Sequence, residues 1–126
     1  MWKEVFLLAI AGALGALSRY GLSGLVQLLA GERFAWGTLV VNALGCFLFG
    51  FIWMLAAEER TLISAQTRFV VLTGFMGAFT TFSTFAFETS RYLNDSQWAL
   101  AAANLIGQNG LGLICVLLGM AAGRLF

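Results

Sequence analysis

The chain has 126 residues, of which 60% are hydrophobic and only 10% are charged, and its net charge is +1 at pH 7. This composition lies outside the range of ordinary soluble domains, and the near-neutral charge gives no indication of a nucleic-acid-binding surface. The absence of histidine removes the usual proton shuttle and the commonest metal ligand. The composition therefore predicts a membrane protein.

Four apolar segments are long enough to cross a bilayer, whose hydrocarbon core of about 30 Å needs about 20 residues per helix. Tryptophans stand at segment ends, where indole rings favour the membrane interface. The segments lack the strict alternation of transmembrane β-strands. We expect a single all-α domain over residues 1–126, with both termini on the same side. The predicted transmembrane helices cover residues 5–29, 37–57, 69–92 and 98–122.

The first segment follows Lys3 and has the apolar core of a secretory signal peptide. However, apolar residues resume beyond Arg19 and continue to Leu29, and Glu4 weakens the basic start. We therefore expect a retained helix. Arg19 is the only basic residue well inside a predicted span, and we expect it to have a structural role, bonding carbonyls or a loop near a helix end.

The second segment contains Asn42 among valine, alanine and leucine residues. An amide carries two donor hydrogens and an acceptor oxygen, and exposing it to lipid is costly. Asn42 is therefore either a hydrogen-bonding link between helices or part of the lining of a polar pathway. The segment alone leaves both interpretations open.

The third segment has glycines and hydroxyl side chains where a purely structural span has leucine, isoleucine and alanine. Gly74 and Gly77 weaken a helix, and the threonines and serine that follow are poor helix formers. We expect a helix break near residues 77–80, which is tolerated in a membrane only where it is buried in protein or lines a cavity. The alternative is an intact helix whose hydroxyls bond back to the preceding turn.

Beyond the expected break, phenylalanine recurs every third residue at Phe79, Phe82 and Phe85, so the three rings are expected to share one helical face. Ring edges are positive and ring faces negative, so a lining of rings and hydroxyls suits either a small anion or a cation. Glu88 either caps or gates a vestibule or is a solvated helix-end carboxylate. The neighbouring hydroxyls belong to Thr80, Thr81, Ser83 and Thr84.

The fourth segment contains three carboxamides, Asn104, Gln108 and Asn109. Asn104 and Gln108 are four residues apart and are predicted to share a helical face. The predicted spans have no carboxylate near the middle of the membrane. The carboxamides therefore favour a protein that coordinates ions without exchanging protons.

Basic residues are almost evenly divided between the two sides of the predicted bundle. Since their excess normally sets orientation, such a chain can insert both ways, unless Arg60 and Arg68 suffice to keep the termini inside. Small residues at helical spacing predict close helix packing, which leaves little room for a wide central pore. We therefore expect a dimer with pathways along its interface. The terminal side carries Lys3, Arg60, Arg68 and Arg124, and the other side carries Arg33, Arg91 and the nearby Arg19.

These residues together resemble the small fluoride-exporting channel family, the CrcB or Fluc proteins. Three patches match: GxxGAxxRY at residues 12–20, GTLxVNxxG at 37–45, and GxxGxxTTFSTF at 74–85 followed by Glu88. The third patch is highly specific and the second is moderately specific. The fourth segment matches only in pattern, because the family often has Tyr and Ser in its polar track there.

The resemblance implies an antiparallel, dual-topology homodimer in the bacterial inner membrane, with two pathways that let fluoride leave the cell passively. It implies that Phe82 and Phe85 offer ring edges to fluoride, that Ser83 and Thr84 donate hydroxyl hydrogen bonds, and that Asn42 lies along the pathway.

The resemblance also implies that Glu88 stands near a vestibule. A structural sodium ion at the dimer centre would be bound by the backbone carbonyls of Gly77 and Thr80 from both subunits.

Two other functions are possible for a small membrane protein of this kind. A dual-topology exporter of drugs or other cations needs a membrane-embedded carboxylate for proton exchange, and only Glu4 and Glu88, near segment ends, are available. A non-transporting scaffold would not need the track of hydroxyls and phenylalanines. An enzyme is not expected, because the sequence offers no nucleophile–base pair, metal cluster or phosphate loop.

Overall fold

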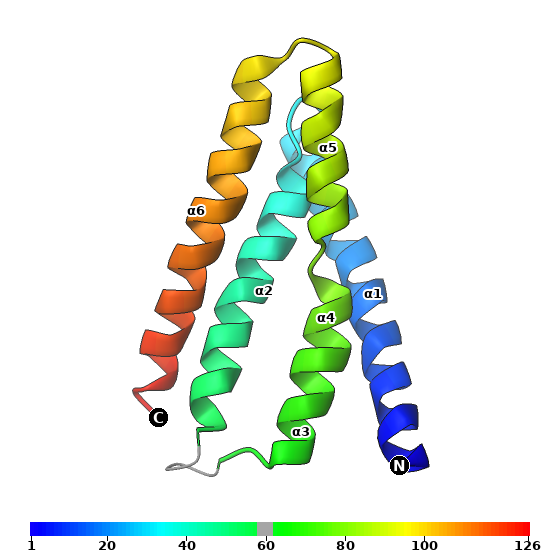
Figure 1. Cartoon of the computed structure of the whole chain (residues 1–126), viewed down its shortest axis with the longest axis vertical. Coiled ribbons are helices and arrows are strands. Elements are labelled where there is room, and N and C mark those ends of the chain that lie inside the picture. Colours follow the sequence, from blue (N-terminus) through cyan, green and yellow to red (C-terminus); the bar gives the residue numbers. More distant parts are fainter. Residues whose placement is uncertain (58–61) are drawn as a thin grey trace.

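The computed structural model describes residues 1–57 and 62–126. It is all-helical, and Figure 1 shows both termini at the same end of the bundle. Arg60, which was counted in the charge balance, lies outside the described residues. The elements are α1 (Trp2–Ala30), α2 (Trp36–Leu55), α3 (Ala65–Phe69), the π-helical segment η1 (Val70–Met76), α4 (Gly77–Phe79), α5 (Phe82–Asn94) and α6 (Trp98–Gly123).

The described chain has four helical spans that are long and apolar enough to cross a membrane: α1, α2, α6 and the composite span Ala65–Asn94. Few of their side chains are buried in a single chain: 11% of the residues in the most apolar stretches of α1 and α6, and 28% in those of α2 and the composite span. An apolar surface of this extent requires lipid or another chain to cover it. The predicted architecture of four transmembrane helices is therefore confirmed.

Helices α2 and α6 pack closely along their length because glycines face the opposite backbone (Figure 1). A methyl group added at Gly119 would collide with the carbonyl of Phe47, and one added at Gly50 would collide with the carbonyl of Val116. Small residues allow this close approach in lipid, where no hydrophobic force between helices drives association. The predicted packing role of the glycines is confirmed for this helix pair.

The third span is interrupted at Thr80 and Thr81, whose backbones are extended (φ −86° and ψ 158°; φ −148° and ψ 113°). The first half of the span, η1 and α4, packs against α1, whereas the second half, α5, packs against α6 (Figure 1). The predicted break is confirmed, at the C-terminal edge of the expected region, and the alternative of an intact helix is wrong.

The prediction that three phenylalanines share one helical face is wrong, because the break falls between the first and the second. Phe79 ends α4, is only 3% exposed and stacks on Phe75 at a centroid distance of 5.7 Å. Phe82 and Phe85 lie beyond the break and form a separate pair. The core that Phe79 joins contains Val41, Leu72 and Met76.

We expect Gly119→Ala to destabilise the protein by about 1–3 kcal/mol, the usual cost of overpacking, because its methyl group meets backbone atoms of α2 that cannot move alone. Denaturant titration in detergent micelles measures the change. Gly110→Ala is the matched control on the same helix, where an added methyl meets nothing within 4 Å. Equal stability of the two variants would show that this packing does not limit stability.

Candidate ion pathway at the helix break

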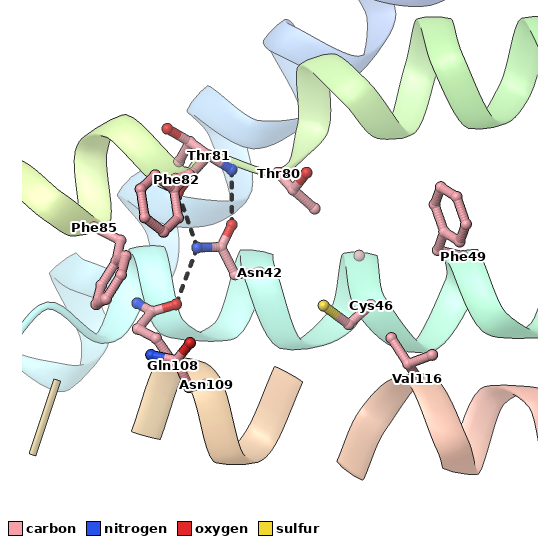
Figure 2. A pocket seen from close by; sticks show the side chains of 11 residues that line it. Asn42, Cys46, Phe49, Thr80, Thr81, Phe82, Phe85, Gln108, Asn109 and Val116 are labelled. Carbon is pink, nitrogen blue, oxygen red and sulfur yellow. Dashed lines mark hydrogen bonds between the residues drawn. The ribbon is translucent and has the colours of Figure 1, made fainter. Parts of the chain in front are cut away.

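Asn42 binds the interrupted backbone of the third span from the neighbouring helix α2. Its Oδ1 accepts a hydrogen bond from the Thr81 N–H at 2.8 Å, and its Nδ2 donates to the Thr81 carbonyl at 3.0 Å. The same Nδ2 donates to Gln108 Oε1 on α6, also at 3.0 Å (Figure 2). Both amide hydrogens are therefore engaged within the protein, and Asn42 links three segments of the chain.

Thr81 is the N-cap of α5. Its Oγ1 accepts from the Thr84 N–H at 3.2 Å, the usual capping bond, and donates to Thr84 Oγ1 at 2.9 Å. A continuous helix would use the N–H groups of Thr81 and Thr84 to bond the carbonyls of Gly77 and Thr80. Since those donors are engaged elsewhere, the two carbonyls lose their ordinary helical partners.

A cavity of about 270 Å³ lies beside the break, between α2, α5 and α6 (Figure 2). Phe82 and Phe85 line it together, with ring centroids 5.4 Å apart and planes inclined by 68°, an edge-to-face pair. Phe85 is 6% exposed, whereas Phe82 is 76% exposed in the single chain. Phe85 thus forms a buried wall of the cavity, whereas the Phe82 ring also faces outward. Its polar lining includes Asn42, Thr80, Thr81, Gln108 and Asn109.

The carboxamides of α6 divide into a buried pair and a separate third residue. Gln108 Nε2 donates to Asn104 Oδ1 at 3.4 Å, which confirms that these two side chains share a face. Asn104 is fully buried and donates from Nδ2 to Thr89 Oγ1 at 2.9 Å. Asn109 instead donates to the carbonyl of Leu105 on its own helix.

Arg19 lines a second cavity of about 200 Å³ on the other side of the break, together with Thr38, Thr81 and Thr84. The hydrogen bonds of the described residues include none from Arg19 to a backbone carbonyl. The structure therefore brings Arg19 close to the hydroxyl track at the N-terminal end of α5, and its guanidinium places a positive charge beside these hydroxyls.

Glu88 lies two turns beyond the break, where its Oε1 accepts a hydrogen bond from Thr38 Oγ1 at 2.7 Å. Its Oε2 is buried and has no hydrogen-bond partner among residues 1–57 and 62–126. Glu88 also lines a hollow of about 560 Å³, together with Arg33 and Arg91, near the connections α1–α2 and α5–α6. Glu32 and Asp95 also line this hollow, so it carries charges of both signs.

Thr38 and Thr89 were not predicted from the sequence as part of this region, and Gly45 was expected only as a small residue that lets helices pack closely. Thr38 bonds Glu88, Thr89 bonds Asn104, and Gly45 leaves room for the Thr80 side chain, whose Cγ2 an added methyl would overlap. Thr38 could have been found from its spacing, because it lies one turn before Asn42 on the same face of α2. The other two depend on contacts between helices, for which the sequence gives no local signal.

The fold and the site define a small four-helix membrane protein with a polar track at a broken span, the arrangement of an ion-conducting protein. The sequence pattern of the CrcB-like proteins (CrcB-like protein, Camphor Resistance) matches residues 6–120, and the chain belongs to this family.

Three relatives carry the name fluoride-specific ion channel FluC. The protein of Nitrosococcus oceani is 66% identical over 125 residues, which cover 99% of both chains. The protein of Solidesulfovibrio magneticus is 52% identical over the same shares, and that of Nitratidesulfovibrio vulgaris is 50% identical over 98% of both chains. The predicted family is confirmed, and so is the prediction that the chain is not an enzyme.

We expect Asn42→Asp to weaken the break, since the carboxylate keeps the acceptor for the Thr81 N–H but sets oxygen against the Thr81 carbonyl and Gln108 Oε1. Loss of buried hydrogen bonds costs about 1–3 kcal/mol per unsatisfied group. Thermal unfolding in micelles gives the change in stability. Asn94→Asp, at the exposed end of α5, is the control, and a loss no greater than the control's would show that Asn42 does not stabilise the break.

Proposed function

We propose that this chain forms a fluoride-specific channel of the cell inner membrane, which lets fluoride leave the cell passively and so lowers its cytoplasmic concentration. The relatives named as fluoride-specific channels match it over nearly the whole length. The observation that carries the proposal is the edge-to-face pair of Phe82 and Phe85 beside hydroxyls and carboxamides in one cavity.

The chemistry of this cavity suits a small anion. An unpaired charge in hydrocarbon costs tens of kcal/mol by Born estimates, and each hydrogen bond to a charged group returns only about 1.5–3 kcal/mol. Several donors must therefore replace the hydration shell in succession. Ring edges carry positive partial charge. Thr84, which lines the second cavity across the break, accepts a bond from Thr81, so its own hydroxyl proton can donate there. Ser83 adjoins this hydroxyl pair.

We assign the fluoride pathway to two aromatic and four polar residues. Phe82 and Phe85 present ring edges, Ser83 and Thr84 donate hydroxyl bonds, and Asn42 borders the pathway while its amide fixes the wall. Glu88 stands at the charged hollow, and Arg19 supports the hydroxyl track structurally.

The functional unit that we propose is an antiparallel homodimer with two pathways. Phe82 is largely exposed in a single chain, although it lines the cavity, and a second copy placed against it would close this side of the cavity. The nearly balanced basic residues allow insertion in both orientations. Two copies related by an axis in the membrane plane would each contribute a broken span to the dimer centre.

A structural sodium ion at that centre fits the backbone of the break. The carbonyls of Gly77 and Thr80 lack the helical donors that usually bond them, because Asn42 and Thr81 engage those N–H groups. Hard cations prefer oxygen ligands, and carbonyls at the ends of helix segments direct negative partial charge outward. Two such carbonyls from each subunit would form a four-oxygen shell. A bound cation would supply a fixed positive field for the passing anion.

The alternative of a small dual-topology exporter is not favoured, because the relatives are named as ion channels and no carboxylate lies in the middle of a span.

We expect Phe82→Ile and Phe85→Ile each to reduce fluoride efflux from liposomes by about tenfold, because an aromatic edge contact of about 1.5 kcal/mol is lost at the site of passage. Fluoride and chloride electrodes measure both fluxes in parallel. Phe87→Ile is the control, on the same helix and with an exposed ring. Undiminished fluoride efflux in both cavity variants would overturn the pathway assignment.

Sodium is expected to stabilise the reconstituted dimer. At fixed ionic strength, replacing choline by sodium at about a hundred times its Kd should add about 3 kcal/mol of stability. Thermal unfolding followed by the loss of the dimer on size exclusion gives the readout. An identical unfolding temperature in the two salts would exclude a structural sodium site.

A further inference from the structure

The side chain of Thr80, the first residue of the break, is held at two points. Its Oγ1 donates a hydrogen bond to the carbonyl of Met76 at 3.1 Å, and its backbone N–H donates to the same carbonyl, also at 3.1 Å. The methyl group on the other branch, Cγ2, faces Gly45 of α2. Figure 2 shows Thr80 on the same side of α2 as Asn42. The hydroxyl therefore ties Thr80 to the helix before the break, and the methyl group rests on α2.

Gly45 differs from the glycines that only let α2 and α6 approach each other. A methyl group added at Gly50 or Gly119 would meet a backbone carbonyl of the opposite helix. A methyl group added at Gly45 would first meet Thr80 Cγ2, at 2.2 Å, and then the ring of Phe79, at 3.3 Å. Both neighbours belong to the interrupted span. Gly45 therefore provides a seat, the space that the Thr80 methyl group occupies on the surface of α2.

This seat and the amide of Asn42 act on the same peptide group. The Thr80 carbonyl and the Thr81 N–H belong to one planar unit, and a trans peptide bond directs them in opposite directions; the described residues contain no cis peptide bond. Asn42 Oδ1 accepts from that N–H at 2.8 Å, so the Thr80 carbonyl points away from Asn42 Oδ1. Asn42 thus sets the direction of this carbonyl, and the seat at Gly45 sets its distance from α2.

A side chain at position 45 would displace this peptide group. Carbon atoms pack at about 3.5–4.0 Å, so the contact of 2.2 Å would have to open by more than about 1 Å. Turning the Thr80 side chain does not relieve the collision freely, because β-branched residues have few rotamers and rotation would break the hydrogen bond to Met76. Binding groups have to be held within about 0.5 Å of their working positions. Alanine at position 45 would therefore move the Thr80 carbonyl beyond this tolerance.

We propose that Gly45 is a positioning residue of the sodium site, whose seat for the Thr80 methyl group holds the Thr80 carbonyl in place as a ligand. The proposal rests on the proposed function, of which the structural sodium ion is a part. Because the two subunits are identical, a single substitution would displace one ligand in each of them, two of the four oxygens. Gly45 thereby acquires a role in ion binding in addition to the close packing expected from its size.

Thermal unfolding of the dimer in micelles tests the seat, at fixed ionic strength with choline progressively replaced by sodium. For Gly45→Ala we expect the sodium concentration that gives half of the stabilisation to rise about tenfold to a hundredfold, the usual effect of disturbing a group that positions a metal ligand. An unchanged sodium midpoint would show that Gly45 only packs helices, and the inference would fail while the proposed function stands.

Gly119→Ala is the matched control, because its methyl group disturbs the packing of α6 against Phe47 and Phe51 of α2 and does not meet the break. It should lower the unfolding temperature in both salts and leave the sodium midpoint where it is in the wild type. A purely structural effect of Gly45→Ala would follow the same pattern. A midpoint that moves equally in the two variants would contradict the proposal.

A second substitution tests the seat itself. Thr80→Ser removes Cγ2 and keeps the hydroxyl and the backbone carbonyl. In that background the methyl group of Gly45→Ala has no Cγ2 to displace, so we expect it to move the sodium midpoint by no more than about threefold relative to Thr80→Ser alone. An equally large shift in both backgrounds would overturn the proposal. If Gly45→Ala forms no dimer, recovery of the dimer by Thr80→Ser supports the seat, and a failure to recover contradicts it.

Two measurements on the wild type distinguish the failure of this inference from that of the proposed function. An unfolding temperature that does not depend on sodium excludes the sodium site and, with it, the seat. The absence of fluoride efflux from liposomes that contain the wild-type protein rejects the channel.

Discussion

The hydrogen bonds between Asn42 and the backbone of Thr81 are the interaction on which the rest of the site depends. A helix interrupted at membrane depth exposes N–H and carbonyl groups that cost several kcal/mol each when unpaired in hydrocarbon. A single carboxamide supplies both an acceptor and a donor to the same residue, so the interruption is stable. Without it, the backbone would regain its bonds most simply by closing into a continuous helix.

The interruption redirects the third span from one neighbour to another. Its first half packs on α1 and its second half on α6, while α2, packed closely against α6 through glycines, lies beside both halves. The aromatic pair, the threonines of the break and three carboxamides, those of Asn42, Gln108 and Asn109, are consequently brought to one cavity. A straight helix could not place Phe85 against α6 and Phe79 in the core with α2 at the same time.

The sequence predicted the spans well because their lengths and apolar content follow from bilayer thickness alone. It also predicted the break, since glycine and threonine weaken a helix wherever they lie. The prediction that Phe79, Phe82 and Phe85 share one face was wrong, because it assumed an unbroken helix and the break lies between Phe79 and Phe82. The hydrogen-bond partners of Asn42 could not be predicted from the sequence, because they depend on how three separate helices approach one another. The π-helical segment before the break likewise has no signal in the residues Val70–Met76.

Phe82 stands on the outer surface of the single chain while it borders the cavity. The same ring therefore belongs to two surfaces, the wall of the cavity and the outer face that the chain presents to its surroundings. A substitution of this ring changes both surfaces at once: it alters the wall of the cavity and the face that the protein presents within the bilayer. The side chain at this position therefore has to satisfy two requirements together, the shape of the cavity and the contact with the lipid or protein that covers the outer face.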